Sequence, residues 1–368
     1  MRDIGIGIVG GGYMGKAHAI AMASVGIVFD PGLRPRLEMI AASSADSAER
    51  YRAAYGFARA TGDWRVLVAD PKVEAVVIAS PQETHREIAE MAFGLGKPVL
   101  CEKPLGASLA DGEAMAAAAA RAGVANMVGF NYIRTPASQF ARTLVASGSL
   151  GRILWFRGEH TEDFDADPDR PAHWRNFGEA NGTMGDLAPH MVNAALALIG
   201  PIARLSADLG TCHPDRPGTD GRAVNDDIGH FLCRFANGAM GHLGFSRVAL
   251  GRKMGYAYEI TGTKGAIRFD QEDQNAIWLY RAEGPDAERG FRKILTGPAH
   301  PDYLPFSQGP GHGTGYNDQI VIEARDFLSA IESGRPVWPT FADGLAVSRI
   351  IQAARASAAT GQWQEVPQ

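Results

Sequence analysis

The chain has 368 residues, of which 45% are hydrophobic and 21% are charged, and its formal net charge is -5. This length exceeds the size at which one hydrophobic core usually stops growing, so two domains are expected, and the composition excludes a disordered protein. The 36 basic and 41 acidic residues are scattered along the chain. They form no basic stripe of the kind that binds nucleic acid.

The first residues of the chain and its cysteines indicate the cellular compartment to expect. Only three residues precede the strand-like run 4–9, which leaves no room for a signal peptide, and no apolar run reaches the length of a membrane span. Cys101, Cys212 and Cys233 are odd in number and widely spaced, which fits neither a disulfide framework nor a zinc site. We therefore expect a cytoplasmic protein with no metal site and no membrane or nucleic-acid partner.

The first third of the chain alternates short β-branched runs with longer helical patterns. The predicted strands cover 4–9, 37–42, 75–79, 98–101 and 124–129. Such alternation predicts βαβ units and a doubly wound parallel sheet covered on both faces. One predicted helix carries both a start and a stop signal, with Asp46 as the N-cap candidate and Gly56 at its C-terminal end. We expect a Rossmann-type dinucleotide-binding domain over residues 1–131.

Beyond residue 150 the pattern changes to longer alternating runs. The expected strands cover 152–160, 227–235, 239–248 and 256–261, with Asn237-Gly238 as a hairpin turn. Helices are expected at about 186–199 and twice after Tyr316. Residues 132–368 are thus predicted to form an α/β domain with an open, largely antiparallel sheet. Its last helices are expected to be able to pack back on the first domain.

A glycine-rich turn follows the first strand. Gly10, Gly12 and Gly15 have GxGxxG spacing between a strand and a helix, and Tyr13 and Met14 lie within the motif. The first glycine permits the tight turn, the second lets the backbone approach a pyrophosphate, and the third lets helix and strand pack closely. A glycine-rich turn without a ligand is the alternative, but the strand-turn-helix context favours a dinucleotide.

The end of the second strand departs from the usual pattern. An acidic residue that accepts from the ribose hydroxyls is expected there, but Ser43 and Ser44 occupy the place, and the nearest arginine is Arg50. Two hydroxyls could bind either a ribose diol or a 2'-phosphate. The residues alone therefore leave NAD and NADP both open.

Polar turns follow the next two predicted strands. Ser80, Pro81 and His85 come after one, and the turn Glu102-Lys103-Pro104 comes after the other. In an open parallel sheet, ligands bind outside the carboxyl ends of the strands, so both turns are candidates for lining the nicotinamide. A solvated surface lysine is the alternative for Lys103.

Asp186 and His190 open the helix expected at 186–199. Residues four apart share one helix face, so a carboxylate and an imidazole there could converge on one substrate hydroxyl as general acid and base. The alternatives are an N-capping Asp and a core His. Pro189 is tolerated because it falls in the first helical turn.

These motifs together resemble the glucose-fructose oxidoreductase, inositol dehydrogenase and MocA (Gfo/Idh/MocA) family. The supporting stretches are 96–101, 129–136 and 148–152, and the resemblance covers nearly the whole chain. Three later stretches, 296–301, 322–327 and 341–344, resemble a branch that includes levoglucosan dehydrogenase. The resemblance implies a Rossmann domain joined to an α/β domain with an open sheet, a nicotinamide cofactor, and oligomerisation through that sheet as a homodimer or homotetramer.

Carried over by position, the resemblance implies that Lys103, Asp186 and His190 are catalytic. It also implies cofactor-lining residues, which together with the motif residues above are Gly10, Gly12, Tyr13, Met14, Gly15, Ser43, Ser44, Ser80, Pro81, His85, Glu102, Lys103, Asn131, Trp174 and Arg175. The further candidates for substrate contact are Tyr132, His160 and His312. Ser43, where many NAD-preferring members carry an acid, weakens the cofactor assignment, and NAD is expected with NADP as the alternative.

The expected activity is transfer of a hydride between NAD(P) and a secondary hydroxyl of a sugar, anhydrosugar or cyclitol. Lys103 or His190, the latter oriented by Asp186, would take the hydroxyl proton, and the residues do not rank the two. The alternatives are a non-catalytic dinucleotide-binding regulator and a sugar oxidoreductase that retains its cofactor.

Overall fold

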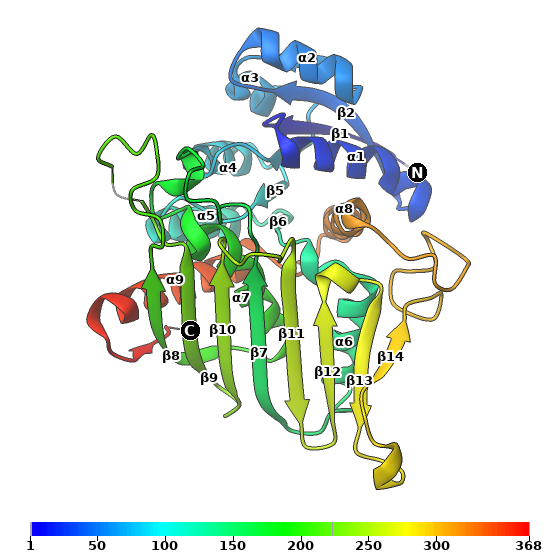
Figure 1. Cartoon of the computed structure of the whole chain (residues 1–368). Coiled ribbons are helices and arrows are strands. Elements are labelled where there is room, and N and C mark those ends of the chain that lie inside the picture. Colours follow the sequence, from blue (N-terminus) through cyan, green and yellow to red (C-terminus); the bar gives the residue numbers. More distant parts are fainter. Residues whose placement is uncertain (1, 223, 368) are drawn as a thin grey trace. The chain divides into compact units, whose positions relative to one another are not determined.

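The computed structural model describes residues 2–222 and 224–367. The chain divides into two compact units (Figure 1). Unit 1 comprises the chain up to Arg134 together with Gly315–Leu345, and unit 2 comprises Thr135–Thr314 together with the chain from Ala346 onward. The first boundary between the units thus follows Arg134, whereas the sequence suggested a boundary after residue 131. Among the described residues, no helix is long and apolar enough to cross a membrane.

Unit 1 is built on a six-stranded parallel sheet of order β3-β2-β1-β4-β5-β6. Its strands are β1 (Arg2–Val9), β2 (Leu33–Ala41), β3 (Arg59–Thr61), β4 (Ala75–Ile78), β5 (Val99–Glu102) and β6 (Asn126–Gly129). Both faces are covered, which is why β4 is buried along its whole length and reads as a continuous apolar run. The sequence did not predict β3, a three-residue strand.

Helices cover both faces of this sheet. They are α1 (Tyr13–Val28), α2 (Ala45–Tyr55), α3 (Trp64–Ala69), α4 (His85–Gly94), α5 (Leu109–Ala122) and α8 (Tyr316–Ser333), with short 3-10 turns η1 (Gln82–Thr84) and η2 (Tyr132–Arg134). Helix α1 leads from β1 to β2, whereas α4 leads from β4 to β5 in the opposite direction across the sheet. Right-handed crossovers therefore place the two helices on opposite faces. Helix α8 packs against α1.

The start of α2 corrects one expectation from the sequence. Ser44, not Asp46, is the N-cap, because its side chain accepts from the backbone N–H of Ser47, and Ser47 in turn accepts from the backbone N–H of Ser44. This reciprocal pair is a capping box with serine at its second position. The predicted stop is confirmed, since Gly56 closes the helix at φ 79°.

Unit 2 is built on a nine-stranded sheet of order β14-β13-β12-β11-β7-β10-β9-β8-β15. Its strands are β7 (Ile153–Thr161), β8 (Ile202–Gly210), β9 (Ile228–Phe235), β10 (Met240–Ser246), β11 (Gly255–Gly262), β12 (Gly265–Asp270), β13 (Ala276–Arg281), β14 (Arg292–Leu295) and β15 (Gln364–Glu365). In the described chain, β7 and β10 form its one parallel pair. The predicted turn joins β9 to β10 as an antiparallel hairpin, with Gly238 at φ 87°.

The helices of unit 2 lie mainly on one face of its sheet. Helices α6 (Pro136–Ala146) and α7 (Ala188–Leu198) lie behind the sheet in Figure 1. Helix α9 (Phe341–Thr360) begins in unit 1, and in unit 2 Ser357 accepts from the backbone of β8. Four short helical turns complete the unit: η3 (Trp174–Asn176), η4 (Thr183–Leu187), η5 (Gln271–Asp273) and η6 (Asp286–Glu288).

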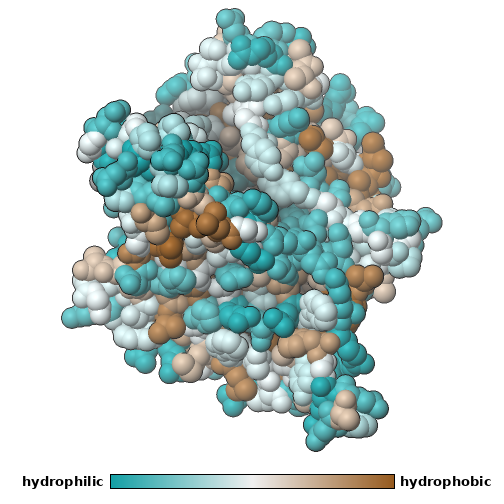
Figure 2. Space-filling view, in the orientation of Figure 1, coloured by the Kyte–Doolittle hydropathy of each residue, from teal (hydrophilic) through white to brown (hydrophobic). Residues whose placement is uncertain are grey.

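The other face of this sheet is open. Along β7, Phe156 is buried on the helix side, whereas Trp155 and Arg157 are exposed on the opposite side. Figure 2 shows hydrophobic and hydrophilic residues mixed on the visible surface. The predicted fold class, a Rossmann sheet followed by a largely antiparallel open sheet, is confirmed.

Candidate active site

The glycine-rich turn of unit 1 leaves an open space at the start of α1. Gly10 has φ 101°, and a Cβ there would meet the carbonyl group of Ala79. A Cβ on Gly15 would meet the carbonyl oxygen of Gly10, whereas a Cβ on Gly12 would meet nothing within 4 Å. The space over Gly12 adjoins the unpaired N–H groups of a helix N-terminus, which is the arrangement that holds a pyrophosphate. The turn therefore fits a dinucleotide.

Two tyrosines of α2 contact the glycine-rich turn at Gly11. The Tyr55 hydroxyl donates to the Gly11 carbonyl over 2.9 Å. The rings of Tyr51 and Tyr55 stack with centroids 5.5 Å apart, and a Cβ on Gly11 would meet the Tyr51 ring. Neither tyrosine was expected to contact the glycine-rich turn. The available signal was the i, i+4 spacing of two aromatic residues on the helix after the second strand.

The two serines after β2 have different roles. The Ser44 hydroxyl caps α2, where it accepts from the Ser47 N–H over 3.2 Å. Ser43 is exposed at the carboxyl end of β2. Ser44, one of the two residues predicted to contact the ribose, thus has its hydroxyl engaged as the N-cap of α2.

A buried histidine braces the turns that follow β4 and β5. His85 Nε2 lies 2.9 Å from the Ser80 carbonyl oxygen, and Nδ1 lies 3.1 Å from the Pro104 carbonyl oxygen. Burial lowers the pKa of His85. On the same turn the hydroxyls of Ser80 and Thr84 are 2.7 Å apart, while Pro81 is exposed. His85 therefore sets the spacing between the two turns predicted to line the cofactor.

The Glu102-Lys103-Pro104 turn begins where β5 ends. Glu102 is buried, and its Oε1 atom lies 2.7 Å from His18 Nε2 on α1. Its Oε2 atom accepts from the Lys103 backbone N–H over 3.3 Å. Lys103 itself is half-buried, and the Lys103–Pro104 peptide bond is cis. The carboxylate thus holds the backbone that carries the candidate lysine.

Tyr316, at the start of α8, contacts several residues of unit 1 that were predicted to line the cofactor or the substrate. Its ring lies 5.8 Å from that of Tyr13 and 6.1 Å from that of Tyr132, and its hydroxyl donates to the Met14 sulfur over 3.4 Å. Asn131 is buried, and its amide donates to a side chain of the same helix. Tyr316 was not predicted, because no motif in the sequence links a helix near the C-terminus to the first domain.

In unit 2 the candidate Asp186 lies on a π-helical turn, η4, that leads into α7. Gly182 opens this turn at φ 73°, which favours glycine. The Asp226 carboxylate accepts from the Met184 N–H over 2.7 Å and from the Thr183 hydroxyl over 2.5 Å. The turn is therefore capped by a charged side chain, and such π-helical turns are frequent at functional sites. The helix predicted at about 186–199 is therefore an α-helix over Ala188–Leu198, preceded by the π-helical turn Thr183–Leu187.

Arg175 connects the loop before this turn to Asp186. Its guanidinium Nε lies 3.4 Å from Asp186 Oδ2, and it stacks on the Trp174 ring at 4.1 Å. Trp174 is 58% exposed, whereas His190 on α7 is only 6% exposed. Trp174, Arg175 and Asp186 thus form one candidate group within unit 2, and His190 lies on α7, the helix that follows the turn of Asp186.

His160 on β7 adds to this group. Its Nδ1 lies 3.0 Å from the Leu187 carbonyl oxygen and its Nε2 lies 3.1 Å from Glu162 Oε1. The rings of His160 and His190 are 5.6 Å apart. His312, in contrast, lies in the exposed loop between β14 and α8, with its Nδ1 3.2 Å from the Ser307 hydroxyl. His160 therefore supports the turn that carries Asp186.

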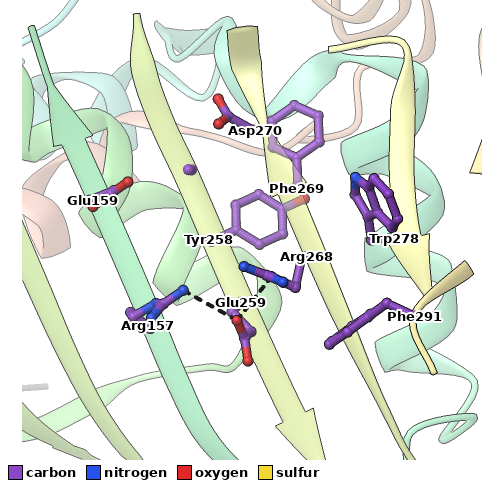
Figure 3. A pocket seen from close by; sticks show the side chains of 10 residues that line it. Arg157, Glu159, Tyr258, Glu259, Arg268, Phe269, Asp270, Trp278 and Phe291 are labelled. Atoms are coloured by element: carbon purple, nitrogen blue, oxygen red, sulfur yellow. Dashed lines mark hydrogen bonds and ion pairs between the residues drawn. The ribbon is translucent and has the colours of Figure 1, made fainter. Parts of the chain in front are cut away.

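A separate hollow lies on the sheet of unit 2 (Figure 3). Glu259 accepts from Arg157 and pairs with Arg268, each over 3.2 Å, and Trp278 and Phe291 flank these charges. None of the predicted site residues lines this hollow.

The chain matches known families over most of its length. Residues 4–130 match an oxidoreductase family with an NAD-binding Rossmann fold, and residues 138–268 match the GFO/IDH/MocA C-terminal domain. The levoglucosan dehydrogenase of Pseudarthrobacter phenanthrenivorans is 38% identical, over 100% of this chain and 99% of that protein. The inositol 2-dehydrogenase of Rhizobium meliloti is 26% identical, over 96% of each chain.

The solved structures agree with these matches. A structure of levoglucosan dehydrogenase in complex with NADH and levoglucosan covers 100% of both chains at 38% identity, with a TM-score of 0.97. The resemblance drawn from the motifs, including that to the levoglucosan dehydrogenase branch, is thereby confirmed. The chain is a member of the Gfo/Idh/MocA family of NAD-binding oxidoreductases.

Proposed function

We propose that this dehydrogenase oxidises a secondary hydroxyl of a sugar, with anhydrosugars such as levoglucosan as the first substrates to test and cyclitols as the second. The observation that supports the proposal is the pairing of Arg175 with Asp186 on the η4 turn, with the buried His190 on α7, the helix that follows this turn directly. The full-length likeness to levoglucosan dehydrogenase supports this substrate class.

The proposed mechanism assigns the dinucleotide to unit 1 and takes the candidate acid-base residues of each unit separately, Lys103 in unit 1 and His190 with Asp186 in unit 2. NAD, when bound, supplies the acceptor for the hydride that leaves the hydroxyl-bearing carbon. The open space over Gly12 would take its pyrophosphate, and the turns that begin at Ser80 and Glu102 would line its nicotinamide. Lys103 or His190 then accepts the proton of the hydroxyl as the carbonyl forms, and Asp186 orients His190. Arg175 would help to hold the Asp186 carboxylate, since its Nε lies 3.4 Å from Asp186 Oδ2.

The substrate test is a panel of levoglucosan, other anhydrosugars, inositols, hexoses, apiose and glycosides, each with NAD and with NADP. Reduced cofactor is followed by its absorbance. We expect an anhydrosugar to give the highest kcat/KM, and NAD to be preferred by a modest margin. The absence of turnover of every compound in this panel with either cofactor would overturn the proposal. A preference of about tenfold for NADP would overturn the cofactor order. A tightly retained cofactor with no net reduced product would point to the retained-cofactor alternative.

The catalytic roles are tested by Lys103→Ala and His190→Ala. Each is expected to lower kcat by about two to four orders of magnitude while the Kd for NAD changes little, because a positioned acid-base group is lost. Lys72→Ala and His213→Ala, which remove a lysine and a histidine outside the proposed site, are the matched controls. If Lys103 and His190 act as one unit, the double variant will be little worse than the worse single variant. Near-normal turnover in folded Lys103→Ala would contradict the assignment.

We further propose that the protein assembles as a homodimer or homotetramer through the open face of the sheet in unit 2. On this face Leu232 is 57% exposed, Met240 50%, Trp278 38% and Trp155 36%. The hollow in Figure 3 adjoins Trp278. Exposed apolar groups rimmed by charges are typical of association surfaces. Light scattering should give a multimer for the wild type and a smaller species for Leu232→Asp, and a monomeric wild type would contradict the proposal.

A further inference from the structure

A cluster of ionisable side chains is buried directly beneath the Lys103 turn, and the proposed mechanism does not use it. His18 on α1, Glu102 at the end of β5 and Glu323 on α8 direct their polar atoms to one point, where these atoms all lie within 4.8 Å of one another. Their exposed fractions are 0%, 7% and 1%. Ionisable groups are rarely buried so deeply unless they are paired or have a function.

The surroundings of the cluster supply two fixed positive charges. The Arg134 side chain is 2% exposed; its Nε lies 3.5 Å from Glu323 Oε2, and it also pairs with Asp326. Arg325 pairs with the same Asp326 over 2.7 Å. Three carboxyl groups, those of Glu102, Glu323 and Asp326, thus share two guanidinium groups. With every carboxyl ionised, the cluster is neutral only while His18 carries a proton.

Other titratable groups that face Glu102 do not alter this balance near neutral pH. Burial lowers the pKa of His85, which favours its neutral form. Burial also raises the pKa of the Cys101 thiol and that of the Tyr316 hydroxyl, so both stay protonated. The charge of the cluster therefore changes through His18 and Glu323.

The cluster is joined to the candidate catalytic turn through Glu102. One carboxylate oxygen contacts His18, and the other accepts from the Lys103 N–H. Gly129, opposite Glu102 on β6, makes room for this carboxylate, because a Cβ there would lie 2.9 Å from Oε1. Any change in the charge of the cluster thus acts at the carboxyl end of β5, the edge of the sheet where ligands bind.

We propose that His18, Glu102 and Glu323 form a proton-linked positioning site that holds the Lys103 turn and adjusts the preference of unit 1 for oxidised over reduced dinucleotide. The oxidised nicotinamide ring is cationic and the reduced ring is neutral. A cluster that has lost its shared proton carries one more negative charge and stabilises the cationic ring. This inference rests on the proposed placement of the nicotinamide at the carboxyl ends of β4 and β5.

The charges around Glu323 give the direction of the effect. Burial raises the pKa of Glu323 to about 7, although the charges of Arg134 and His18 act against that rise. For His18, burial alone would lower the pKa, but the hydrogen bond to Glu102 and the charges of Glu102 and Glu323 raise it overall. The cluster therefore releases a proton as the pH passes through neutrality, and the affinity for NAD⁺ relative to NADH should increase with pH.

The same three residue types could also hold a divalent metal ion, but the distances favour a proton. His18 Nε2 and Glu102 Oε1 are 2.7 Å apart, which is a direct hydrogen bond. Ligands at about 2.1 Å from a tetrahedral metal ion lie roughly 3.4 Å from one another. The guanidinium group of Arg134 beside Glu323 further disfavours a second cation.

The test is calorimetric titration of the full-length protein with NAD⁺ and, separately, with NADH between about pH 5.5 and pH 8.5. We expect the ratio of the two Kd values to change in favour of NAD⁺ by about threefold to thirtyfold as the pH rises through about 7. Glu323→Gln keeps the side-chain shape and removes the titration, so its ratio should be independent of pH. Glu332→Gln, an exposed glutamate on the same helix, is the matched control and should behave as the wild type.

Two outcomes would overturn the proposal. One is a pH-dependent ratio that persists in folded Glu323→Gln. The other is a divalent ion bound at one per chain in the wild type and lost in His18→Asn. If Glu323→Gln does not fold, carboxyl carbon NMR of the wild type decides, because it must show a carboxyl that titrates between about pH 6 and pH 8. No sugar is present in any of these measurements, so a wrong substrate assignment leaves their outcome unchanged.

Discussion

Each unit of this protein buries a charged cluster beside a candidate catalytic turn, but the two clusters differ in how their carboxyl groups are satisfied. In unit 1, Glu323 faces another carboxyl group and one guanidinium group at 3.5 Å. In unit 2, Asp165 is fully buried yet accepts from His173 over 3.0 Å and from Asn176 over 2.9 Å, with Arg247 at 3.4 Å.

The difference shows that depth alone does not set the protonation state of a buried carboxyl. For Asp165, burial would raise the pKa, but the hydrogen bonds from His173 and Asn176 and the charge of Arg247 lower it overall. For Glu323, burial prevails over its single nearby guanidinium and raises the pKa. The number of donors therefore decides which cluster can respond to pH near neutrality. The cluster in unit 2 instead fixes structure, since Arg247 also donates to the Arg175 carbonyl over 3.0 Å.

The largest expected effect is that of Arg247→Met. Arg247 pairs with Asp227 over 2.7 Å and with Asp165, and both carboxylates are fully buried. Its loss removes the guanidinium that both buried carboxylates share, so the free energy of unfolding should fall by about 3–5 kcal/mol. Urea denaturation measures this change. Arg157→Met, which breaks an exposed pair with Glu259, should cost less than about 1 kcal/mol. Equal losses would contradict the structural role of the cluster.

The next effect is a pH dependence of stability, of opposite sign in the two units. The folded-state pKa of Glu323 is raised from 4.5 to about 7. Its contribution is therefore fully present below the unfolded pKa, decreases as the pH rises and is lost above about 7, a change of roughly 3 kcal/mol. Glu323→Gln should flatten this part of the curve of unfolding free energy against pH.

Asp165 supplies the opposite half of this test. Its folded-state pKa is lowered. Its contribution is thus present above the unfolded pKa and is lost as the pH falls through the folded pKa. Asp165→Asn should flatten the acid side of the curve and leave the neutral side as in the wild type. Two variants with the same pH profile would show that the clusters do not differ in the way described.

The sequence predicted much of the framework and little of these clusters. The glycine motif and the alternating patterns predicted both sheets, because local periodicity and turn residues specify strands and helices. His18, Glu323 and Arg134 are far apart in the chain and meet only when α8 packs on α1. No local pattern marks such residues. Asp46 was predicted as the N-cap and Ser44 was not considered; the observed capping box has serine at its second position, where Glu or Gln is more usual.

The smallest expected effect is that of removing an uncharged hydrogen bond in unit 1. It gives a reference value for the effects of the charged interactions. The Tyr55 hydroxyl donates to the Gly11 carbonyl, and no formal charge takes part in this bond. Tyr55→Phe keeps the stacking on Tyr51, whose ring fills the space behind Gly11. The loss of one neutral hydrogen bond should cost about 1 kcal/mol in unfolding free energy.

Because Gly11 lies between the two glycines nearest the proposed pyrophosphate, the Kd for NAD⁺ should increase by about twofold to fivefold. The Kd for NADH should increase by the same factor at every pH, since the phosphates are identical in the two dinucleotides. A change in the NAD⁺ to NADH ratio in Tyr55→Phe would show that neutral contacts of the turn also affect redox preference, and the charge of the His18 cluster would then not be its sole cause.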